Sequence, residues 1–354
     1  MKKFSFKKVL KKEECFFIAE AGVNHHNKIS LAEKIIKQAS LGGANAIKFQ
    51  TYKAEKLASK NSPYYWDLKQ VKEKSQYKLF KKFDHFNQED YFKLKKICDH
   101  YKIIFSSTPF DLESVEMLDK IVPFFKIASA DLTNLPLIEK IAKTKKPILI
   151  STGASNINEI KFINNFLNKN FPKNEKIFMH CILSYPTNYL DANLQFINIL
   201  KKELKSEYIG YSDHTMPDKD LIVLTTAYLQ GARVIEKHFT EKSLKGKKNN
   251  DHFHSIDYHD IIKFKKNLKL IKKIVQQNDK RIILKSEKKS RLNARRSIFT
   301  NGTLKKNQRI TIENLIVKRP GTGISPLHIK KIIGKKSKKN LYDDHLIKWS
   351  DIRS

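Results

Sequence analysis

Residues 16–51, FFIAEAGVNHHNKISLAEKIIKQASLGGANAIKFQT, show the pattern that decides the fold. The stretch begins and ends with short apolar runs, 16–22 and 46–51, of the kind that forms buried β-strands. Between them, Leu31, Ile35 and Ala39 recur at helical spacing, and the Gly-Gly pair at 42–43 is typical of a helix end. The order of elements is therefore a strand, a helix and a second strand.

The same alternation recurs along the first 240 residues. Eight nearly continuous apolar runs turn polar at their C-terminal ends, as parallel strands covered on both faces do: 16–22, 46–51, 103–110, 124–131, 147–154, 177–181, 208–214 and 234–240. Helical segments separate most of them; one follows Asn87, and another begins at Asn156 with Glu159 in capping-box position. This repetition predicts an α/β fold, a TIM (β/α)₈ barrel. The long interval 52–86 predicts a lid or excursion over the barrel top.

The charge is strongly positive, with 70 Lys+Arg against 36 Asp+Glu and a formal net charge of +34. Only eight of the basic residues are arginine, and the lysines occupy the polar sides of nearly all the expected helices. Nucleic-acid modules instead concentrate Arg and Lys on one face. We therefore expect a solvated basic surface without specific nucleic-acid binding, and attraction to anionic substrates.

Membrane and secreted classes are not indicated. No apolar run approaches the ~18 residues needed to cross a bilayer, and the run from Cys15 to Ala19 is too short for a signal peptide. Three widely spaced cysteines form neither a disulfide framework nor a metal-ligand pattern. A cytoplasmic protein is expected.

The texture of the sequence changes after about Gln277. A basic, apparently irregular stretch is followed by short runs such as RRSIFT and HLIKWSDI, punctuated by Asn-Gly and Pro-Gly. We expect a barrel domain over 1–280, a linker over 281–292 and a small, mostly β domain over 293–354.

Polar residues gather where the strands end, which is where barrel enzymes place their active sites. Lys48 and Lys126 lie in apolar strands, where a charge is costly without an anionic partner. With Ser129, Ser151 and the backbone of the ISTGA turn, they suit a phosphate and a carboxylate bound together.

Two histidines, His214 and His238, end consecutive strands, so their rings can converge on one cation. The alternative is that hydrogen bonds to Glu20 or Asp213 satisfy both imidazoles.

The motifs taken together closely resemble the sialic acid synthase family, which includes N-acetylneuraminate, legionaminate and pseudaminate synthases. The resemblance covers essentially the whole chain and rests on AEAGVNHHN, KFQTYKAEKL, STPFD, KIASADLTNLPL, ISTGAS, YPT, GYSDHT, EKHFT, RRSI and KRPGTGISP. It implies a TIM barrel followed by an antifreeze-like (SAF) domain, in a homodimer whose SAF domains cover the partner barrels. It also implies phosphoenolpyruvate as donor, an N-acylated amino sugar as acceptor, and Mn²⁺ or Mg²⁺ as cofactor.

Site residues follow from the same resemblance. The positions that match the family's phosphoenolpyruvate-binding residues are Lys48, Lys126, Thr108, Ser129, Ser151 and Ser212. His214 and His238 match metal ligands. The positions that match residues facing the metal or the sugar are Glu20, Gln50, Phe110, Tyr185 and Asp251. Arg319 matches an arginine that the neighbouring subunit sends to the N-acyl group.

Two positions depart from the family pattern. Asp131 stands where the family often carries Glu, and Leu183 replaces a polar residue before Tyr-Pro-Thr. Either Glu20 or Asp131 is expected to activate water, with Lys126 stabilising the departing phosphate.

Alternatives to an N-acetylneuraminate synthase remain open at this point. They are a legionaminate or pseudaminate synthase, another phosphoenolpyruvate-dependent deoxy-sugar-acid synthase using a phosphorylated aldose, and nucleic-acid binding through the basic surface. Ice binding by 293–354 is disfavoured because that segment is crowded with Lys and Arg.

Overall fold

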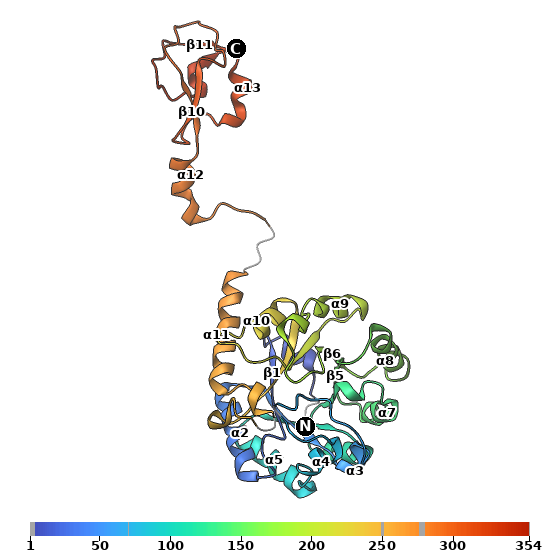
Figure 1. Ribbon diagram of the computed structural model, residues 1–354. Coiled ribbons are helices and arrows are strands. Elements are labelled where there is room, and N and C mark those ends of the chain that lie inside the picture. The colour runs from blue at the N-terminus through green and yellow to red at the C-terminus, as the bar shows by residue number, and fades with distance from the viewer. Residues whose placement is uncertain (1–3, 70, 249–250, 276–279, 354) are drawn as a thin grey trace. The chain divides into compact units, whose positions relative to one another are not determined.

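The computed structural model describes residues 4–69, 71–248, 251–275 and 280–353. These fall into two compact units, 1–275 and 276–354 (Figure 1). The first unit ends at Val275, whereas the sequence placed the end of the barrel domain at residue 280. The expected irregular linker over 281–292 is wrong in part, because the 3₁₀ turn Lys285–Glu287 and the helix α12 (Lys288–Ala294) occupy most of it.

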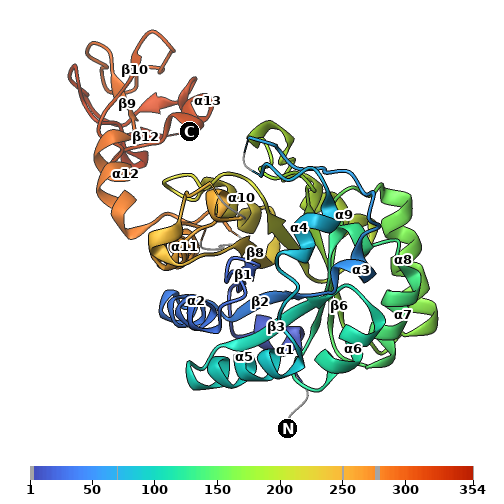
Figure 2. The ribbon, with the colours of Figure 1, turned by 60° about the horizontal axis from the view of Figure 1, so that its bottom comes forward.

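The first unit is a TIM barrel, as predicted. Its eight parallel strands are β1 Phe16–Gly22, β2 Ala46–Thr51, β3 Ile104–Pro109, β4 Phe125–Ile127, β5 Ile148–Ser151, β6 Lys176–Cys181, β7 Ile209–Asp213 and β8 Ala232–His238. They are hydrogen-bonded in the order β3-β2-β1-β8-β7-β6-β5-β4. The two end strands β3 and β4 also lie side by side, so the sheet closes. The helices form an outer ring around it (Figure 2).

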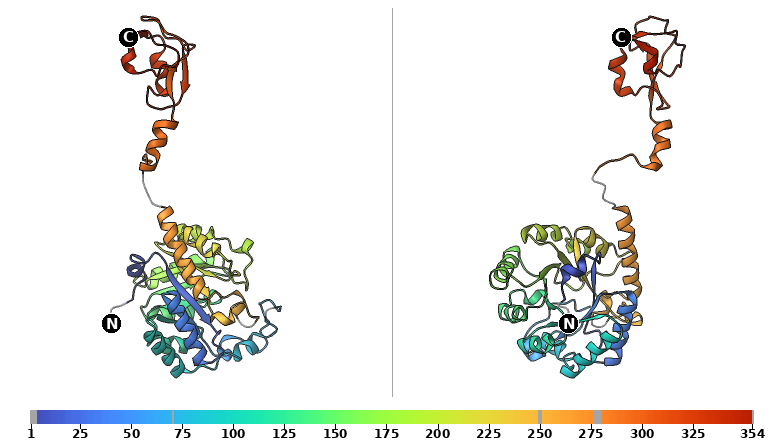
Figure 3. Two further views of the ribbon diagram at one scale, coloured as in Figure 1. Left: turned by 90° about the vertical axis from the view of Figure 1, so that its left-hand side faces the viewer. Right: turned by 180° about the vertical axis from the view of Figure 1, so that it is seen from behind.

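Eight helices of the described part of the chain lie outside the strands. They are α2 Ile29–Gly42, α5 Gln88–His100, α6 Leu112–Asp119, α7 Leu135–Lys143, α8 Ile157–Asn170, α9 Phe196–Glu203, α10 Ile222–Leu229 and α11 Tyr258–Ile274. The end of α2 and the starts of α5 and α8 agree with the sequence. Asn156 and Glu159 form the predicted capping box of α8. Gly43 ends α2 at φ 82°, a left-handed conformation that favours glycine. Helix α11 packs beside α2 (Figure 3).

The barrel interior is apolar at the N-terminal ends of its strands. A buried cluster is formed there by Phe6, Phe16, Ile18, Ala46, Phe124, Leu149, Ile177, Met179 and Val234. Phe6 belongs to the short helix α1 (Phe6–Leu10), and its ring contacts those of Phe16 and Phe124 at centroid distances of 5.3 and 4.9 Å. These aromatic side chains close this end of the barrel, so the interior is accessible from the other end.

The segment between β2 and α5 contains two short helices, α3 (Ala54–Leu57) and α4 (Gln76–Lys81). Local bonds hold it: the indole of Trp66 donates to the carbonyl of Glu73 at 2.9 Å, and Asp84 accepts from the amide of Ala54 at 3.0 Å. This excursion supplies one wall of the pocket described below.

The second unit is small and built on short antiparallel pairs. Strand β9 (Ser297–Thr300) pairs with β10 (Leu315–Lys318), and β11 (Lys336–Ser337) with β12 (Ile352–Arg353). A helix, α13, spans Ile329–Ile332. The unit has its own apolar core, formed by Ile298, Leu304, Ile310, Leu315, Ile324, Ile332, Leu341, Ile347 and Ile352. Arg319 follows β10 and its side chain is exposed. Among the described residues of both units, none of the helices is long and apolar enough to cross a membrane.

Candidate active site

The functional side chains occupy the upper interior of the barrel because side chains of a strand alternate between its two faces. Residues of the apolar cluster at the N-terminal ends of the strands are followed, two positions later on the same inward face, by polar residues. The pairs are Ile18 and Glu20, Ala46 and Lys48, Phe124 and Lys126, Leu149 and Ser151, and Val234 and Glu236. The next inward position on β8 is His238. The strand pattern therefore places an apolar floor beneath a charged layer.

Two buried lysines and two buried glutamates form one group, here called the lysine cluster: Lys48, Lys126, Glu20 and Glu236. The Lys48 Nζ lies 2.7 Å from Glu20 Oε2 and 3.6 Å from Glu236 Oε1. Lys126 Nζ lies 3.3 Å from the same Glu236 oxygen. Glu236 thus joins the two ammonium groups, and the buried charges are mutually compensated.

The two carboxylates of this cluster differ in proton affinity. Burial raises the pKa of Glu20 above its ordinary value, and the nearby charge of Glu236 adds to this effect. Burial would also raise the pKa of Glu236, but Lys126 and Lys48 hold it below its ordinary value. Such a separation assigns different chemical roles to neighbouring acids. Glu236 stays ionised, whereas Glu20 is the group able to exchange a proton.

Hydroxyl groups bond to members of the lysine cluster or lie beside them. Lys48 Nζ donates to Thr108 Oγ1 at 3.0 Å, and Ser212 Oγ donates to Glu236 Oε1 at 3.1 Å. The hydroxyls of Ser151 and Ser106 are buried without a hydrogen-bond partner. These open hydroxyls fit a ligand with several acceptor oxygens.

The Gly153 amide, by contrast, is already engaged, because it donates to Ser129 Oγ at 3.1 Å. A Cβ at position 153 would lie 2.8 Å from that hydroxyl oxygen, which explains the glycine. To bind a phosphate, this amide would have to leave Ser129 Oγ.

Beside the lysine cluster lies a second group, here called the imidazole cluster: His214, His238, Asp251 and His254. Nδ1 of His238 is 3.3 Å from Asp251 Oδ2, and ligand atoms of His238, Asp251 and His254 all lie within 4.8 Å of one another. The rings of His238 and His254 are 4.5 Å apart, and those of His214 and His238 are 5.4 Å apart. His214 adjoins the three-residue group without belonging to it.

This cluster fits a divalent cation. Both ring nitrogens of His254 are buried without a hydrogen-bond partner, and burial lowers the pKa of this imidazole well below its ordinary value, leaving it neutral. Burial would raise the pKa of Asp251, but His238, His254 and His214 hold it well below its ordinary value. Neutral imidazoles and an ionised carboxylate are the protonation states that bind metals.

The hydrogen bonds considered from the sequence for the two strand-end histidines are not the ones observed. His214 Nδ1 bonds the carbonyl oxygen of Ile182 at 2.8 Å, and His238 pairs with Asp251. Asp213 instead forms an ion pair of 2.7 Å with the buried Lys237. Since Nδ1 of His214 is engaged, its Nε2 is left to face a ligand.

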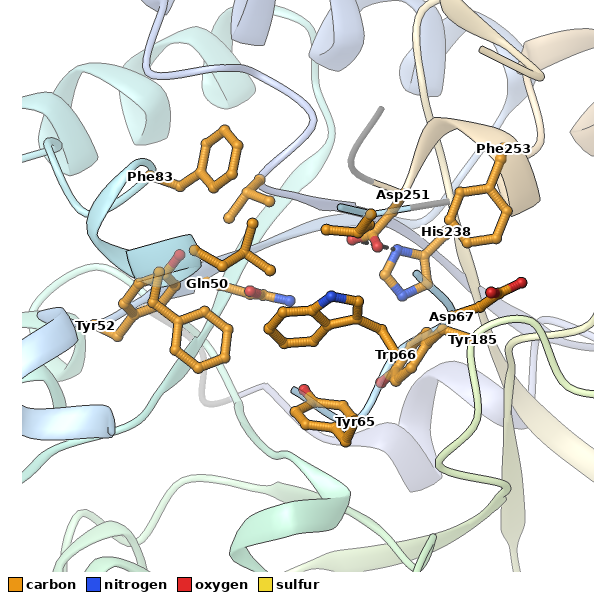
Figure 4. Close-up of a pocket in the computed structure, with 14 residues that line it drawn as sticks. Gln50, Tyr52, Tyr65, Trp66, Asp67, Phe83, Tyr185, His238, Asp251 and Phe253 are labelled. Atoms are coloured by element: carbon orange, nitrogen blue, oxygen red, sulfur yellow. Dashed lines mark ion pairs between the residues drawn. The ribbon is translucent and has the colours of Figure 1, made fainter. Parts of the chain in front are cut away.

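A pocket of about 750 Å³, including its open mouth, lies against the imidazole cluster. Its lining comprises Val23, Gln50, Tyr52, Tyr65, Trp66, Asp67, Val71, Leu79, Phe80, Phe83, Tyr185, His238, Asp251 and Phe253. Figure 4 shows the Trp66 indole in the middle of this group, with His238 and Asp251 paired at one side and Tyr52 and Phe83 at the other. The ion pair thus lies at one end of the pocket, and aromatic side chains line both ends.

Other predicted site residues lie at different distances from this centre. Gln50 donates to Glu20 Oε1 at 3.3 Å, and the Tyr185 ring packs at a tilt against that of His214 with centroids 4.2 Å apart. Phe110 packs edge-on to Tyr52 and is not among the pocket-lining residues. Asp131 is half-buried and accepts from Asn134 at 3.0 Å. Burial raises its pKa, and its second oxygen has no hydrogen-bond partner.

Three polar residues at the centre were not assigned roles from the sequence. Glu236 lies two positions before His238 on the same strand face, and Ser106 two positions before Thr108, so strand periodicity was the available signal. His254 follows the barrel strands in the segment DHFHS, and no strand periodicity marks it.

A TIM barrel with paired lysines, open hydroxyls and a candidate metal site at its mouth is typical of an enzyme that acts on anionic substrates. Comparison with known proteins gives the family. Residues 35–280 match the NeuB family model and residues 295–353 match the SAF domain model. The chain belongs to the NeuB family.

Individual relatives agree with this assignment over nearly the full chain. An N,N′-diacetyllegionaminic acid synthase of Campylobacter jejuni is 37% identical over 95% of this chain and 99% of its own. An uncharacterised protein of Methanocaldococcus jannaschii is 39% identical over 97% of this chain and 96% of its own. A crystal structure of the N-acetylneuraminic acid synthetase of Leptospira borgpetersenii, in complex with citrate, matches with a TM-score of 0.66. It is 34% identical and covers 78% of this chain and 90% of that one.

Proposed function

We propose that this protein condenses phosphoenolpyruvate with the aldehyde of an N-acylated amino sugar, giving a nonulosonic acid and phosphate. The observation that carries the proposal is the adjacency of the lysine cluster and the imidazole cluster at the barrel mouth, in a member of the NeuB family. One group suits an anionic donor, and the other suits a cation that contacts the acceptor.

Phosphoenolpyruvate would bind against Lys48 and Lys126, with hydroxyls of Thr108, Ser129, Ser151 and Ser212 around it. The two lysines are balanced by Glu20 and Glu236 before binding, so an incoming anion adds uncompensated negative charge. The donor must therefore displace a carboxylate from its lysine partner as it binds.

The bond-forming step joins C3 of the enol to the aldehyde carbon, and the aldehyde oxygen gains a proton to become a hydroxyl. Water then adds at C2 and loses a proton, and the C2–O bond to phosphate breaks. A divalent cation, Mn²⁺ or Mg²⁺, held by His214, His238 and Asp251 would supply Lewis-acid polarisation of the aldehyde oxygen. The fixed positions of donor and acceptor supply proximity.

Glu20 is the proposed base for that water, with Asp131 the second candidate. Glu20 contacts Lys48 and Gln50 at the centre of the site, whereas Asp131 has Asn134 as its partner. Lys126, on the opposite side of Glu236, would stabilise the departing phosphate. The roles are thus divided among the barrel's own side chains.

The acceptor proposed for the pocket is neutral. Its described lining residues include no Lys or Arg, so a phosphorylated sugar would lack a cationic partner there. The aromatic wall formed by Tyr65, Trp66 and Phe80 suits methyl groups. A 2,4-diacetamido-6-deoxy aldose offers three such groups, N-acetylmannosamine one.

The proposed assembly is a homodimer in which Arg319 acts in trans on the N-acyl group. The side chain is exposed, and the amide of Gly323 in the following turn is fixed to Ser297 Oγ at 2.9 Å. A guanidinium suits an acyl oxygen because it offers directed donors. Three free, buried cysteines suit a reducing cytoplasm, where we place the reaction.

The experiment is acceptor-dependent phosphate release with phosphoenolpyruvate and Mn²⁺. The panel comprises N-acetylmannosamine, its 6-phosphate, a 2,4-diacetamido-6-deoxy aldose and arabinose 5-phosphate. The diacetamido sugar is expected to give the highest kcat/KM. Release with arabinose 5-phosphate alone would indicate the other deoxy-sugar-acid class, and release with none would contradict the proposal. Salt-dependent nucleic-acid binding that is still detected at physiological salt, in place of catalysis, would instead support a function of the basic surface.

A further inference from the structure

The segment that carries His254 is held firmly against the end of β8. The amide of Ile256 donates to the carbonyl of His238 at 2.8 Å, and the amide of Thr240 donates to that of Ile256 at 3.0 Å. On its other side, Asn24 donates to Ser255 Oγ at 3.2 Å, and Ser255 Oγ donates to the carbonyl of Asp251 at 2.6 Å. The position of the 3₁₀ turn His252–His254 is therefore fixed by the fold.

The two histidines of this turn differ in how their nitrogens are satisfied. In His252, Nδ1 is 2.7 Å from Thr240 Oγ1 and Nε2 is 2.8 Å from Nε2 of His26. In His254, which is 0% exposed, neither ring nitrogen has a partner among the described residues. Because buried polar groups in native proteins are nearly always paired, the unpaired nitrogens of this imidazole indicate that it binds a ligand.

The ring of His254 lies close to the other members of the imidazole cluster. Its ring centroid is 4.5 Å from that of His238, and one of its nitrogens lies within 4.8 Å of ligand atoms on His238 and Asp251. Donor atoms ~2.1 Å from a shared ion lie about 3–4 Å apart, so small side-chain rotations bring the three onto one ion. A half-buried carboxylate and neighbouring imidazoles are a donor set for a transition ion.

We propose that His254 is an additional imidazole ligand of the divalent cation, and that it shifts the site's preference from Mg²⁺ toward nitrogen-binding transition ions. The proposal rests on the proposed function for the location of the cation. Imidazole suits transition ions, whereas Mg²⁺ prefers oxygen donors and retains several waters. Together with His214, His238 and Asp251, this ligand gives three nitrogen donors and one oxygen donor.

The test measures metal binding directly. Full-length apoprotein is titrated with Co²⁺, Mn²⁺ and Mg²⁺ by calorimetry, and the Co²⁺ visible spectrum is recorded. In His254→Phe, Co²⁺ affinity should fall at least about tenfold, its spectrum should change, and Mg²⁺ affinity should change by less than about threefold. The matched control is His252→Gln, in the same turn, which should leave the Co²⁺ spectrum and affinity unchanged.

Variants that bind Co²⁺ like the wild type would overturn the proposal. His254→Gln is measured in parallel, with thermal melts of each apoprotein, in case the aromatic ring prevents folding. Spin-echo modulation of the Cu²⁺-loaded proteins counts the bound imidazoles. Three are expected in the wild type and two in His254→Gln, and an equal count in the two proteins would contradict the assignment.

Phosphate release by the wild type distinguishes this proposal from the proposed function. If His254→Phe loses Co²⁺ affinity and the wild type releases no phosphate with any acceptor, His254 is a metal ligand but the protein is not the proposed synthase. If the wild type releases phosphate and the Co²⁺ spectrum of His254→Phe is unchanged, the protein is the proposed synthase but His254 is not a metal ligand.

Discussion

The lysine cluster and the imidazole cluster lie side by side but differ in how their polar atoms are satisfied. In the lysine cluster each ammonium already has a carboxylate partner, at 2.7 Å for Lys48 and 3.3 Å for Lys126. In the imidazole cluster His254 has unpartnered nitrogens, and no ammonium group pairs with Asp251 among the described residues. The donor must therefore displace existing partners, whereas a cation completes an unfinished set.

Metal removal is expected to have the largest effect, and it distinguishes the role of the imidazole cluster from that of the lysine cluster. Chelation should lower phosphate release at least about 1,000-fold, because Lewis-acid polarisation contributes several kcal/mol, and Mn²⁺ should restore it. Calorimetry on the chelated protein should still detect phosphoenolpyruvate binding to the lysine cluster. Turnover that resists the chelator would show that the reaction does not need the cation.

Replacing Glu20 with Gln should lower kcat about 100- to 10,000-fold, the usual contribution of a general base. Because burial raises the pKa of Glu20, the group loses its base form as pH falls through that raised value. The acid limb of the wild-type kcat profile should therefore disappear in Glu20→Gln. Asp131→Asn is the matched carboxylate control and should keep the limb. Loss of the limb in Asp131→Asn alone would make Asp131 the base.

The next effect concerns the donor. Lys126→Met keeps the apolar stem and removes the charge, so phosphoenolpyruvate affinity should fall tenfold or more; a charged hydrogen bond contributes about 1.5–3 kcal/mol. Metal affinity should be nearly unchanged. The control is Lys140→Met, which breaks a surface pair with Glu116. Equal losses of donor and metal binding would show that Lys126 supports the whole site.

The smallest effect is expected from Arg319→Ala, which should raise the acceptor KM about tenfold and leave donor affinity intact. Arg309→Ala, another exposed arginine of the second unit, is the control. Mixing Arg319→Ala with Lys126→Met subunits should yield hybrid dimers more active than either parent. Proven hybrids without recovered activity would contradict action in trans.

Much of the fold could be predicted because strand and helix periodicities are local. The βαβ order, the α8 capping box and the end of α2 at Gly43 each depend on a few neighbouring residues. The extent of β4 could not be predicted, because Ser129–Asp131 turns into a 3₁₀ helix just beyond Ile127. The helix α12 was missed because its run of charged residues shows no apolar periodicity.

The site was predictable where its residues end strands. Lys48, Lys126 and His238 follow from the strand pattern, but their partners depend on the closure of the barrel. Glu236 bonds residues from distant strands, a contact that sequence spacing does not reveal. His254 enters the site from outside the strands, because the segment after β8 folds back along it.

The reaction itself is tested most directly with phosphoenolpyruvate that carries ¹⁸O in the bridging position. The holoenzyme is incubated with this donor, Mn²⁺ and the diacetamido acceptor, and both products are analysed by mass spectrometry. We predict one nonulosonic acid per phosphate, with the ¹⁸O in the phosphate, because the C2–O bond breaks after water adds at C2. Unlabelled phosphate, or label release that does not depend on the acceptor, would contradict the account.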